Sequence, residues 1–336
     1  MSANAVIFGC EGPVLTVRER DFFAQANPLG FILFARNCQN PAQVRALVAA
    51  LRGTIGRADA PVLIDQEGGR VARLRPPHWR AAPAAARFGA LARGDLERAC
   101  RAARLNARLL AAEVGALGIS VDCAPVLDLS SPGAAGVIGD RAFGDDPALV
   151  AALGRACCEG MLEGGVIPVI KHIPGHGRAT VDSHFELPVV DATRAALEQS
   201  DFHPFKALAD APWAMTCHVV YRAIDPDHPA TLSRAVIADV IRGSMGFDGV
   251  LVTDDLSMKA LRGGLGARAA AALDAGCDVA LHCNGVLGEM EDILAAAPSL
   301  TAAAERRLAA AARRPRATGE VDMARLAADL NNLLGA

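Results

Sequence analysis

Eight short, largely apolar runs recur along the chain, and Ala- and Leu-rich segments with helical periodicity separate most of them. A strand that is buried on both faces needs a continuous apolar run, whereas a half-solvated strand alternates apolar and polar residues. The pattern therefore predicts a parallel sheet wrapped by helices. The runs lie at residues 5–8, 31–34, 62–64, 119–126, 166–170, 214–217, 250–252 and 277–281.

The segments between the runs carry helix boundary signals. Asn40 and Asp146 each precede a proline suited to the first helical turn, and glycines such as Gly118 and Gly276 stand before the next strand. Eight strands favour a closed barrel over an open dinucleotide-binding sheet, and no GxGxxG motif follows the first strand. We therefore predict an α/β protein with one (β/α)8 TIM barrel over residues 1–336. Two C-terminal helices, starting near Ser299, are expected on its outer layer.

Composition excludes several classes of protein. Hydrophobic residues make up 52% of 336 residues, yet no stretch of about 18 is free of charge, so we predict no membrane span. The N-terminus does not resemble a signal peptide, and nine cysteines without framework spacing are typical of reduced thiols. We therefore expect a cytoplasmic protein. A net charge of −3, dispersed basic residues and 4% aromatics argue against nucleic acid as a partner.

Polar residues follow six of the eight apolar runs. In (β/α)8 barrels the carboxyl ends of the strands meet at one rim, where the active site lies. A charged residue at the end of a buried strand needs either a partner or a function. These residues are therefore candidates for one site: Asp65, Asp128, Lys171, His172, His218, Asp254, Asp255 and His282.

Residues 171–184, KHIPGHGRATVDSH, are the densest polar segment and allow several interpretations. The histidines and Asp182 are possible metal ligands, although proline and glycines oppose the helix that a HExxH-like spacing requires. A phosphate-binding loop is a second possibility, but no GK[ST] follows. A third is a mobile loop in which Asp182 fixes the tautomer of His184 and favours its cation, making it a proton carrier. An exposed histidine without a role is the fourth.

Asp254 and Asp255 end the seventh run together. One of them is a candidate nucleophile or base, and the other a residue that caps the backbone. Strand alternation places their side chains on opposite sides, but both faces of this strand are apolar, so periodicity does not decide which acid faces the pocket.

Five segments together resemble glycoside hydrolase family 3, and in particular its single-domain bacterial β-N-acetylglucosaminidases (β-hexosaminidases of the NagZ type). The segments follow the family's order over most of the chain, and the two that contain KHIPGHG…DSH and TDDLSM are the most specific. They are IDQEGGRVARL at 64–74, APVLDL at 124–129, IGDRAFGDDP at 138–147, KHIPGHGRATVDSHFELP at 171–188 and GVLVTDDLSM at 249–258.

The resemblance implies a role for each matching residue. Asp254 matches the nucleophile, His184 the proton donor and acceptor, and Asp182 the residue that orients and tunes His184. It implies a retaining hydrolase that removes terminal β-linked GlcNAc from peptidoglycan fragments, the GlcNAc-anhydro-muramyl peptides, in cytoplasmic cell-wall recycling. The residues that match the family's sugar-binding positions are Asp65, Arg73, Arg141, Lys171 and His172.

The same resemblance implies no cofactor and no metal, a small carbohydrate as the only partner, and a monomer. Arg178 departs from the family, where a smaller or acidic residue is common at this position. A glycine hinge at Gly175 and Gly177 is a further hypothesis, under which Gly177→Pro lowers turnover far more than stability. Phosphorolysis, a catalytically inactive sugar-binding barrel and a metal-dependent hydrolase are the alternatives.

Overall fold

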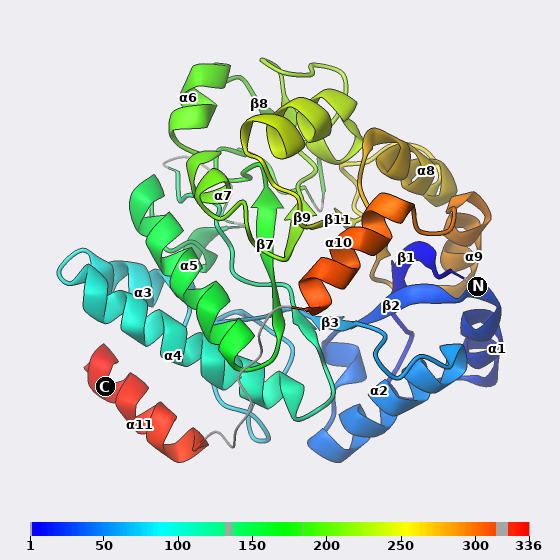
Figure 1. Ribbon diagram of the computed structural model, residues 1–336, viewed down its shortest axis with the longest axis horizontal. Helices are drawn as coiled ribbons and strands as arrows, with labels where there is room; N and C mark the ends of the chain where they lie inside the picture. The colour runs from blue at the N-terminus through cyan, green and yellow to red at the C-terminus, as the bar shows by residue number, and fades with distance from the viewer. Residues whose placement is uncertain (1, 132–135, 137, 184, 314–321, 336) are drawn as a thin grey trace.

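A closed barrel of eight parallel strands forms the centre of the computed structural model, and helices surround it (Figure 1). The structure describes residues 2–131, 136, 138–183, 185–313 and 322–335. The predicted (β/α)8 fold is confirmed, and each predicted apolar run contributes one strand. The barrel strands are β1 (Asn4–Phe8), β2 (Pro28–Leu33), β3 (Val62–Ile64), β6 (Val121–Asp122), β7 (Ile167–Ile173), β9 (Trp213–Thr216), β11 (Val250–Asp255) and β12 (Val279–His282).

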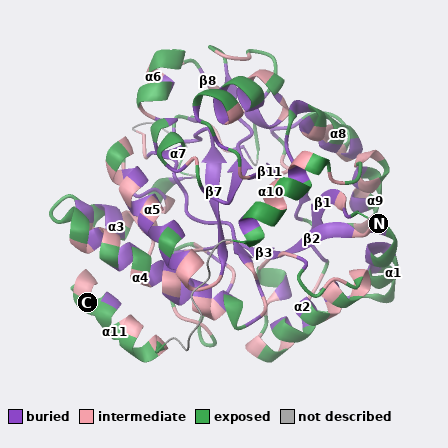
Figure 2. Cartoon of the chain, viewed as in Figure 1, coloured by how far each residue is buried: buried purple, intermediate pink, exposed green. Residues whose placement is uncertain are grey.

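The barrel closes through the pairing of its first and last strands. The hydrogen-bonded order is β1-β12-β11-β9-β7-β6-β3-β2, and β2 pairs with β1. Alternate side chains fill two cores. Ile7, Leu63 and Val250 belong to the cluster inside the barrel, while Phe8 and Ile64 belong to the one between strands and helices. Because both faces are buried, the runs are continuous rather than alternating, and Figure 2 shows the strands as buried.

The helices begin and end largely where the capping residues predict. The side chains of Asn40, Asp95 and Asp146 each accept a hydrogen bond from the first turn that follows, and Gly276 has the left-handed φ of 119° at a helix end. The α-helices are α1 (Val17–Ala26), α2 (Pro41–Ile55), α3 (Ala85–Ala92), α4 (Leu96–Gly115), α5 (Pro147–Glu163), α6 (Arg194–Gln199), α7 (His203–Ala207), α8 (Leu265–Ala275), α9 (Leu287–Ala296), α10 (Ala302–Ala312) and α11 (Met323–Leu334).

Shorter elements lie in the loops between the strands and helices. They are the hairpin strands β4 (Gln66–Gly68) and β5 (Val71–Ala72), the paired strands β8 (Val189–Val190) and β10 (Val220–Tyr221), the 3-10 turns η1 (Ala35–Asn37), η2 (Gly139–Arg141) and η3 (Ala230–Leu232), and the π-helix η4 (Val236–Ser244).

The two C-terminal helices differ in position. α11 packs on α4 in the outer layer, as expected. In contrast, α10 lies across the barrel in Figure 1, and its Ala311 belongs to the core inside the barrel, with Leu308 packed against it. The expectation that both helices join the outer layer is therefore wrong for α10. Its small and apolar residues cover the amino-terminal end of the strands, opposite the rim that carries the polar residues.

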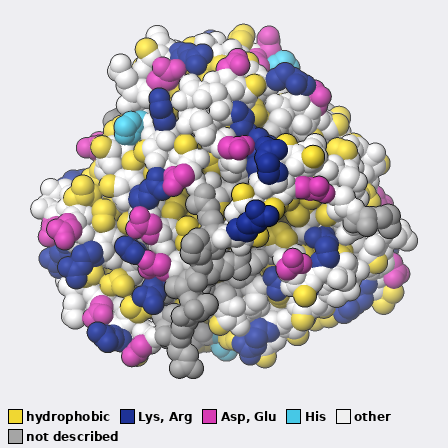
Figure 3. Space-filling model, in the orientation of Figure 1, with side chains coloured by type: hydrophobic (Ala, Val, Ile, Leu, Met, Phe, Trp, Pro, Cys, Tyr) yellow, Lys and Arg dark blue, Asp and Glu magenta, His cyan; other side chains and the backbone are white. Residues whose placement is uncertain are grey.

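The surface seen in Figure 3 mixes basic and acidic side chains over the face that α10 crosses. No helix in the part of the chain that the structure describes is long and apolar enough to span a bilayer.

Candidate active site

The carboxyl ends of the strands surround a cavity of about 640 Å³, a size typical of small-molecule sites. Seven of the eight residues to which the family resemblance gives a role line it, so these positions lie in one cavity. The eighth, His184, lies outside the described residues. The seven are Asp65, Arg73, Arg141, Lys171, His172, Asp182 and Asp254.

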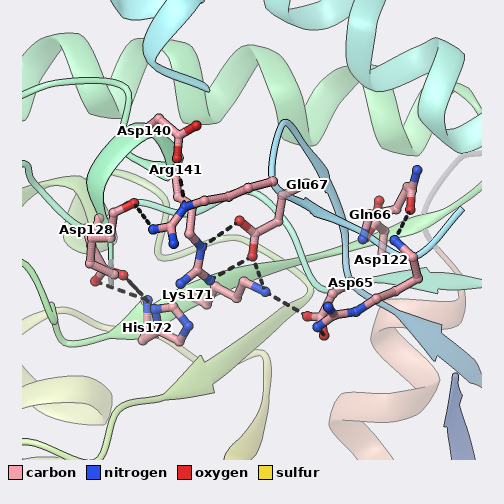
Figure 4. Close-up of polar contacts among 12 residues, drawn as sticks. Asp65, Gln66, Glu67, Asp122, Asp128, Asp140, Arg141, Lys171 and His172 are labelled. Carbon is pink, nitrogen blue, oxygen red and sulfur yellow. Dashed lines mark hydrogen bonds and ion pairs between the residues drawn. The ribbon is translucent and has the colours of Figure 1, made fainter. Parts of the chain in front are cut away.

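One side of the cavity is a cluster of ion pairs, here called the ionic wall. Figure 4 labels four of its members, Asp65, Glu67, Arg141 and Lys171, and Arg73 is the fifth. Lys171 Nζ, from β7, lies 2.8 Å from Asp65 Oδ1 and 2.7 Å from Glu67 Oε1. The Arg141 guanidinium donates to both oxygens of Glu67 at 2.8 Å, and Arg73 donates to Asp65 at 2.8 Å. Each carboxylate thus bonds two cations, which fixes the orientation of the whole cluster.

Electrostatics keep this wall charged. Burial alone raises the pKa of Asp65, but Lys171 and Arg73 outweigh it and hold that pKa well below the ordinary value. Lys171 and Arg141 lower the pKa of Glu67 in the same way. Burial opposes the charge of Lys171, yet the two carboxylates raise its pKa above the ordinary value. The wall therefore offers fixed charged acceptors and donors to a polar ligand at neutral pH.

His172 follows Lys171 and is held by Asp128. Its Nδ1 lies 2.6 Å from Asp128 Oδ2, and the same carboxylate accepts from the backbone amides of His172 and His176. Asp128 does not line the cavity. With an ionised Asp128, Nδ1 donates to it, so Nε2 is the nitrogen of His172 left for a ligand.

Asp254 and Asp255 line the cavity together but differ in their bonds. Asp255 accepts from the Ser257 hydroxyl at 2.6 Å, the Ser257 amide at 3.1 Å and the Cys283 amide at 3.2 Å. Asp254 Oδ1 accepts only the amide of Asp255, at 2.8 Å, among the described residues. Asp255 is therefore the backbone-capping acid, and Asp254 has an oxygen available in the cavity. The apolar periodicity of the strand did not decide between the two acids.

The pKa of Asp254 favours the ionised form. The carboxyl is 8% exposed, and burial alone raises its pKa. His172 and His218, followed by the amide of Asp255, outweigh burial and lower that pKa below the ordinary value. A buried carboxylate that stays ionised with a free oxygen is suited to act as a nucleophile.

The described residues of the segment 174–185, here called the catalytic loop, cover another side of the cavity. The Ser183 carbonyl accepts from the Ala260 amide at 3.2 Å, and the Ser183 hydroxyl lies 3.3 Å from His176 Nε2. Asp182 lines the cavity and is half-buried. Arg178 turns to the outside, where its Nε donates to Asp201 at 2.6 Å. Arg178, where this chain departs from the family, thus anchors the base of the loop and does not enter the cavity.

The two loop glycines are tightly packed. A Cβ on Gly177 would lie 2.3 Å from the Leu129 carbonyl oxygen, and one on Gly175, with φ of 142°, would lie 3.0 Å from Asp201. Side chains at these positions have no room unless the backbone moves. The expectation that Gly177→Pro spares stability therefore does not fit the packing. Close approach of two backbones is the reason for glycine at this position.

Several polar strand ends lie beneath the cavity and do not line it. His218 is fully buried, and His282 is 1% exposed with Nε2 3.2 Å from Glu289. Glu67, which the sequence analysis did not assign, instead bonds both Lys171 and Arg141. The sequence feature that could have identified Glu67 is its position two residues after Asp65. In an extended segment, side chains two residues apart lie on the same side.

The possible metal ligands do not gather. Among the residues that the structure describes, no three His, Cys, Asp or Glu side chains form a group that could hold a metal ion. His172 Nδ1 lies 2.6 Å from Asp128, and His176 Nε2 lies 3.3 Å from the Ser183 hydroxyl.

Comparison with known proteins agrees with this geometry. Residues 16–316 match the model of the glycosyl hydrolase family 3 N-terminal domain. A "Beta-hexosaminidase" of Alkalilimnicola ehrlichii is 42% identical over 288 residues, covering 84% of this chain and 82% of that protein. One of Bordetella avium is 40% identical over 285 residues, covering 83% and 80%. NagZ from Neisseria gonorrhoeae, solved in complex with N-trifluoroacetyl-D-glucosamine, superposes with a TM-score of 0.90 at 30% identity and 99% coverage of both chains.

Proposed function

The chain belongs to glycosyl hydrolase family 3 and is a glycoside hydrolase of the β-hexosaminidase type, and we propose that it removes terminal β-linked N-acetylglucosamine by a retaining double displacement. The observation that carries this proposal is the ionised carboxylate of Asp254, which shares a cavity with the ionic wall and has one oxygen without a hydrogen bond to the described residues. The wall supplies the binding groups, and Asp254 supplies the nucleophile.

In the first step of the proposed mechanism, an Asp254 oxygen attacks the anomeric carbon and forms an ester. The bond to the leaving oxygen breaks, and protonated His184 donates its proton to that oxygen. In the second step neutral His184 takes a proton from water, whose oxygen attacks the anomeric carbon and releases Asp254 as a carboxylate. Two inversions keep the configuration. Asp182 orients His184 and favours its cation.

The ionic wall and His172 bind the sugar in this proposal. Asp65 accepts hydrogen bonds from hydroxyls, while Lys171, Arg73 and Arg141 donate to oxygens. Because each of these groups is already held by a partner at 2.8 Å or less, little ordering is needed when a sugar binds. The complex of Neisseria gonorrhoeae NagZ with an N-acylated glucosamine supports an N-acetyl sugar as the ligand of this site.

The proposed substrates are peptidoglycan fragments that end in GlcNAc, the GlcNAc-anhydro-muramyl peptides of cytoplasmic cell-wall recycling. Their support is the likeness of this chain to curated β-hexosaminidases and to NagZ over most of its length. We propose that the monomer acts on these small molecules without a metal, so that a chelator leaves the rate unchanged.

The decisive assay compares an aryl β-N-acetylglucosaminide with an aryl β-glucoside, using Asp254→Ala as the control. We expect cleavage of the N-acetyl substrate, and a loss of roughly 1,000-fold or more in the variant. Preference for the glucoside would reject the substrate. An active Asp254→Ala variant would reject the nucleophile. Formation of a sugar 1-phosphate in phosphate buffer would replace hydrolysis by phosphorolysis.

A further inference from the structure

Three fully buried polar side chains lie beneath Asp254 and have no part in the mechanism above. Thr216 ends β9, His218 follows two residues later, and Thr231 belongs to the turn η3 (Ala230–Leu232). Each is 0% exposed. Buried polar groups cost free energy unless they are hydrogen-bonded, so their bonds account for their presence.

The three side chains link the peptide group before Asp254 to the peptide group after Asp255. Thr231 Oγ1 lies 2.7 Å from Thr216 Oγ1 and 2.8 Å from His218 Nδ1. At one end, the amide nitrogen of Asp254 lies 3.4 Å from Thr216 Oγ1. At the other end, His218 Nε2 lies 3.0 Å from the carbonyl oxygen of Asp255. The chain of contacts thus starts and ends on the backbone of the Asp254-Asp255 pair.

Counting hydrogens identifies the donor and the acceptor at each step of this chain of contacts. The Asp255 carbonyl only accepts, so His218 Nε2 must carry a hydrogen. Burial lowers the pKa of His218, so the ring is neutral and Nδ1 accepts from the Thr231 hydroxyl. Thr231 Oγ1 then accepts from the Thr216 hydroxyl, and Thr216 Oγ1 accepts from the Asp254 amide. The Thr231 hydroxyl also lies 2.9 Å from the Cys217 carbonyl oxygen, a second acceptor for its hydrogen, and that carbonyl accepts the Thr231 amide at 3.3 Å as well.

We propose that Thr231 and His218 are positioning residues for the nucleophile, because they hold the backbone that aims the Asp254 carboxylate. Asp254 Oδ1 is oriented by the amide of Asp255, and the carbonyl of Asp255 is held by His218. Movement of the Asp255 backbone therefore shifts the amide that orients Asp254 and turns the free oxygen away from the sugar. This inference rests on the proposed function, in which Asp254 attacks the anomeric carbon.

The test is a pair of substitutions at Thr231. Thr231→Val keeps the volume and removes the hydroxyl, whereas Thr231→Ser keeps the hydroxyl. We expect Thr231→Val to lower kcat/KM on an aryl β-N-acetylglucosaminide by about 10- to 100-fold, since misplacement near 1 Å has effects of this size. Thr231→Ser should restore most of that loss. The inhibition constant of N-acetylglucosamine should change less than about twofold in both, because the ionic wall is untouched.

A matched control separates positioning from general loss of stability. Thr253 is also 0% exposed and lies next to Asp254 on β11, but its hydroxyl accepts the Leu281 amide at 2.9 Å, outside the chain of contacts. Thr253→Val should lower Tm about as much as Thr231→Val and keep turnover near wild-type. Equal turnover losses in both valine variants, or equal kcat/KM in the valine and serine variants at Thr231, would overturn the inference.

Two substitutions of His218 test the inference independently. His218→Gln can still donate to the Asp255 carbonyl through its side-chain amide, whereas His218→Leu cannot. We expect Gln to retain more of kcat/KM than Leu, and equal losses would count against the inference. An inactive wild-type enzyme would instead reject the proposed function and leave no rate for this comparison.

Discussion

The ionic wall and the catalytic loop face the same cavity but are built in opposite ways. Lys171 is 2% exposed on its side chain and Glu67 7%, and the wall joins them at 2.7 Å. In the loop, Phe185 is 72% exposed, and Arg178 keeps 40% of its side chain exposed while it pairs with Asp201. The difference indicates a division of labour: the groups proposed to bind the sugar stand on strand ends that ion pairs hold in place, and the proposed proton donor belongs to a segment with more exposed side chains.

Removing the shared cation of the wall should have the largest effect. Lys171→Met leaves Asp65 and Glu67 with one cation fewer in a buried site, and breaking a buried pair costs about 3–5 kcal/mol. We expect that loss in the free energy of unfolding measured with urea, together with a fall of about 1,000-fold or more in kcat/KM from misplaced binding groups.

The control is Lys206→Met on α7, where the lysine is exposed. Surface substitutions of this kind change stability by about 0.5 kcal/mol or less. If Lys171→Met were as stable as Lys206→Met, the wall would not be the rigid half of the site.

The loop should respond in turnover more than in stability. Asp182→Asn removes a charge that, in the proposed mechanism, favours the cation of His184 and raises its pKa above a usual value of about 6.5. As the pH rises, His184 loses the proton that it must donate, and the rate falls. A lower pKa of His184 should therefore move this basic limb of the pH profile to lower pH. We expect kcat to fall by about 100-fold, within the range of general acid–base catalysis. A limb that stays in place would mean that Asp182 does not tune the proton donor.

The same contrast explains how much of the site could be predicted from the sequence. The convergence of Asp65, Lys171 and Asp254 follows from strand topology, because parallel strands in a barrel end at one rim. The choice between Asp254 and Asp255 does not follow, since both faces of β11 are apolar. That choice depends on the three donors that hold Asp255, which come from Ser257 and, across the neighbouring strand, from Cys283.

Hydrogen-bond partners that come from irregular segments could not be predicted either, because they too depend on tertiary contacts. Thr231 lies in a 3-10 turn 15 residues after Thr216, and no periodicity links the two. Its contact depends on how the segment after β9 folds back under β11. The position of α10 is a further case, because its Ala-rich face suits either an outer layer or the end of a barrel.

A smaller effect is expected from a glycine of the catalytic loop that packs on the backbone of Leu129. Gly177→Ala forces a Cβ to within 2.3 Å of the Leu129 carbonyl, and overpacking of this kind costs about 1–3 kcal/mol. Thermal unfolding measures the loss. Gly53→Ala in α2 is the control, since its Cβ meets nothing within 4 Å and alanine stabilises a helix by about 0.5–1 kcal/mol. Equal Tm values for Gly177→Ala and wild-type would show that the loop base is free to move.

A purely pH-dependent effect is expected from Asp122, a carboxyl below the wall that forms no ion pair with the residues that the structure describes. Its Oδ1 accepts the Gln66 amide at 2.9 Å, while Oδ2 is buried without a hydrogen bond among the described residues. Burial is the main cause that raises its pKa to about 7, and the wall carboxylates Asp65 and Glu67 add to it. Asp122 therefore stays protonated in the folded protein at a pH where the unfolded chain has released the proton, since an ordinary aspartate has a pKa near 3.9.

The sign of the pH dependence follows from that difference. Asp122 contributes its full stability below about pH 4, and loses it as pH rises to about 7. The slope from this group is at most about 1.4 kcal/mol per pH unit. Buried histidines such as His176, whose pKa is lowered, act in the opposite direction over the same window, but they are present in wild-type and in Asp122→Asn alike. The stability difference between the two proteins, measured with urea from pH 5 to 7, therefore isolates Asp122: it should shift steadily in favour of Asn as pH rises. A constant difference would mean that Asp122 is ionised, and that the cations of the ionic wall extend their effect to the carboxyl beneath it.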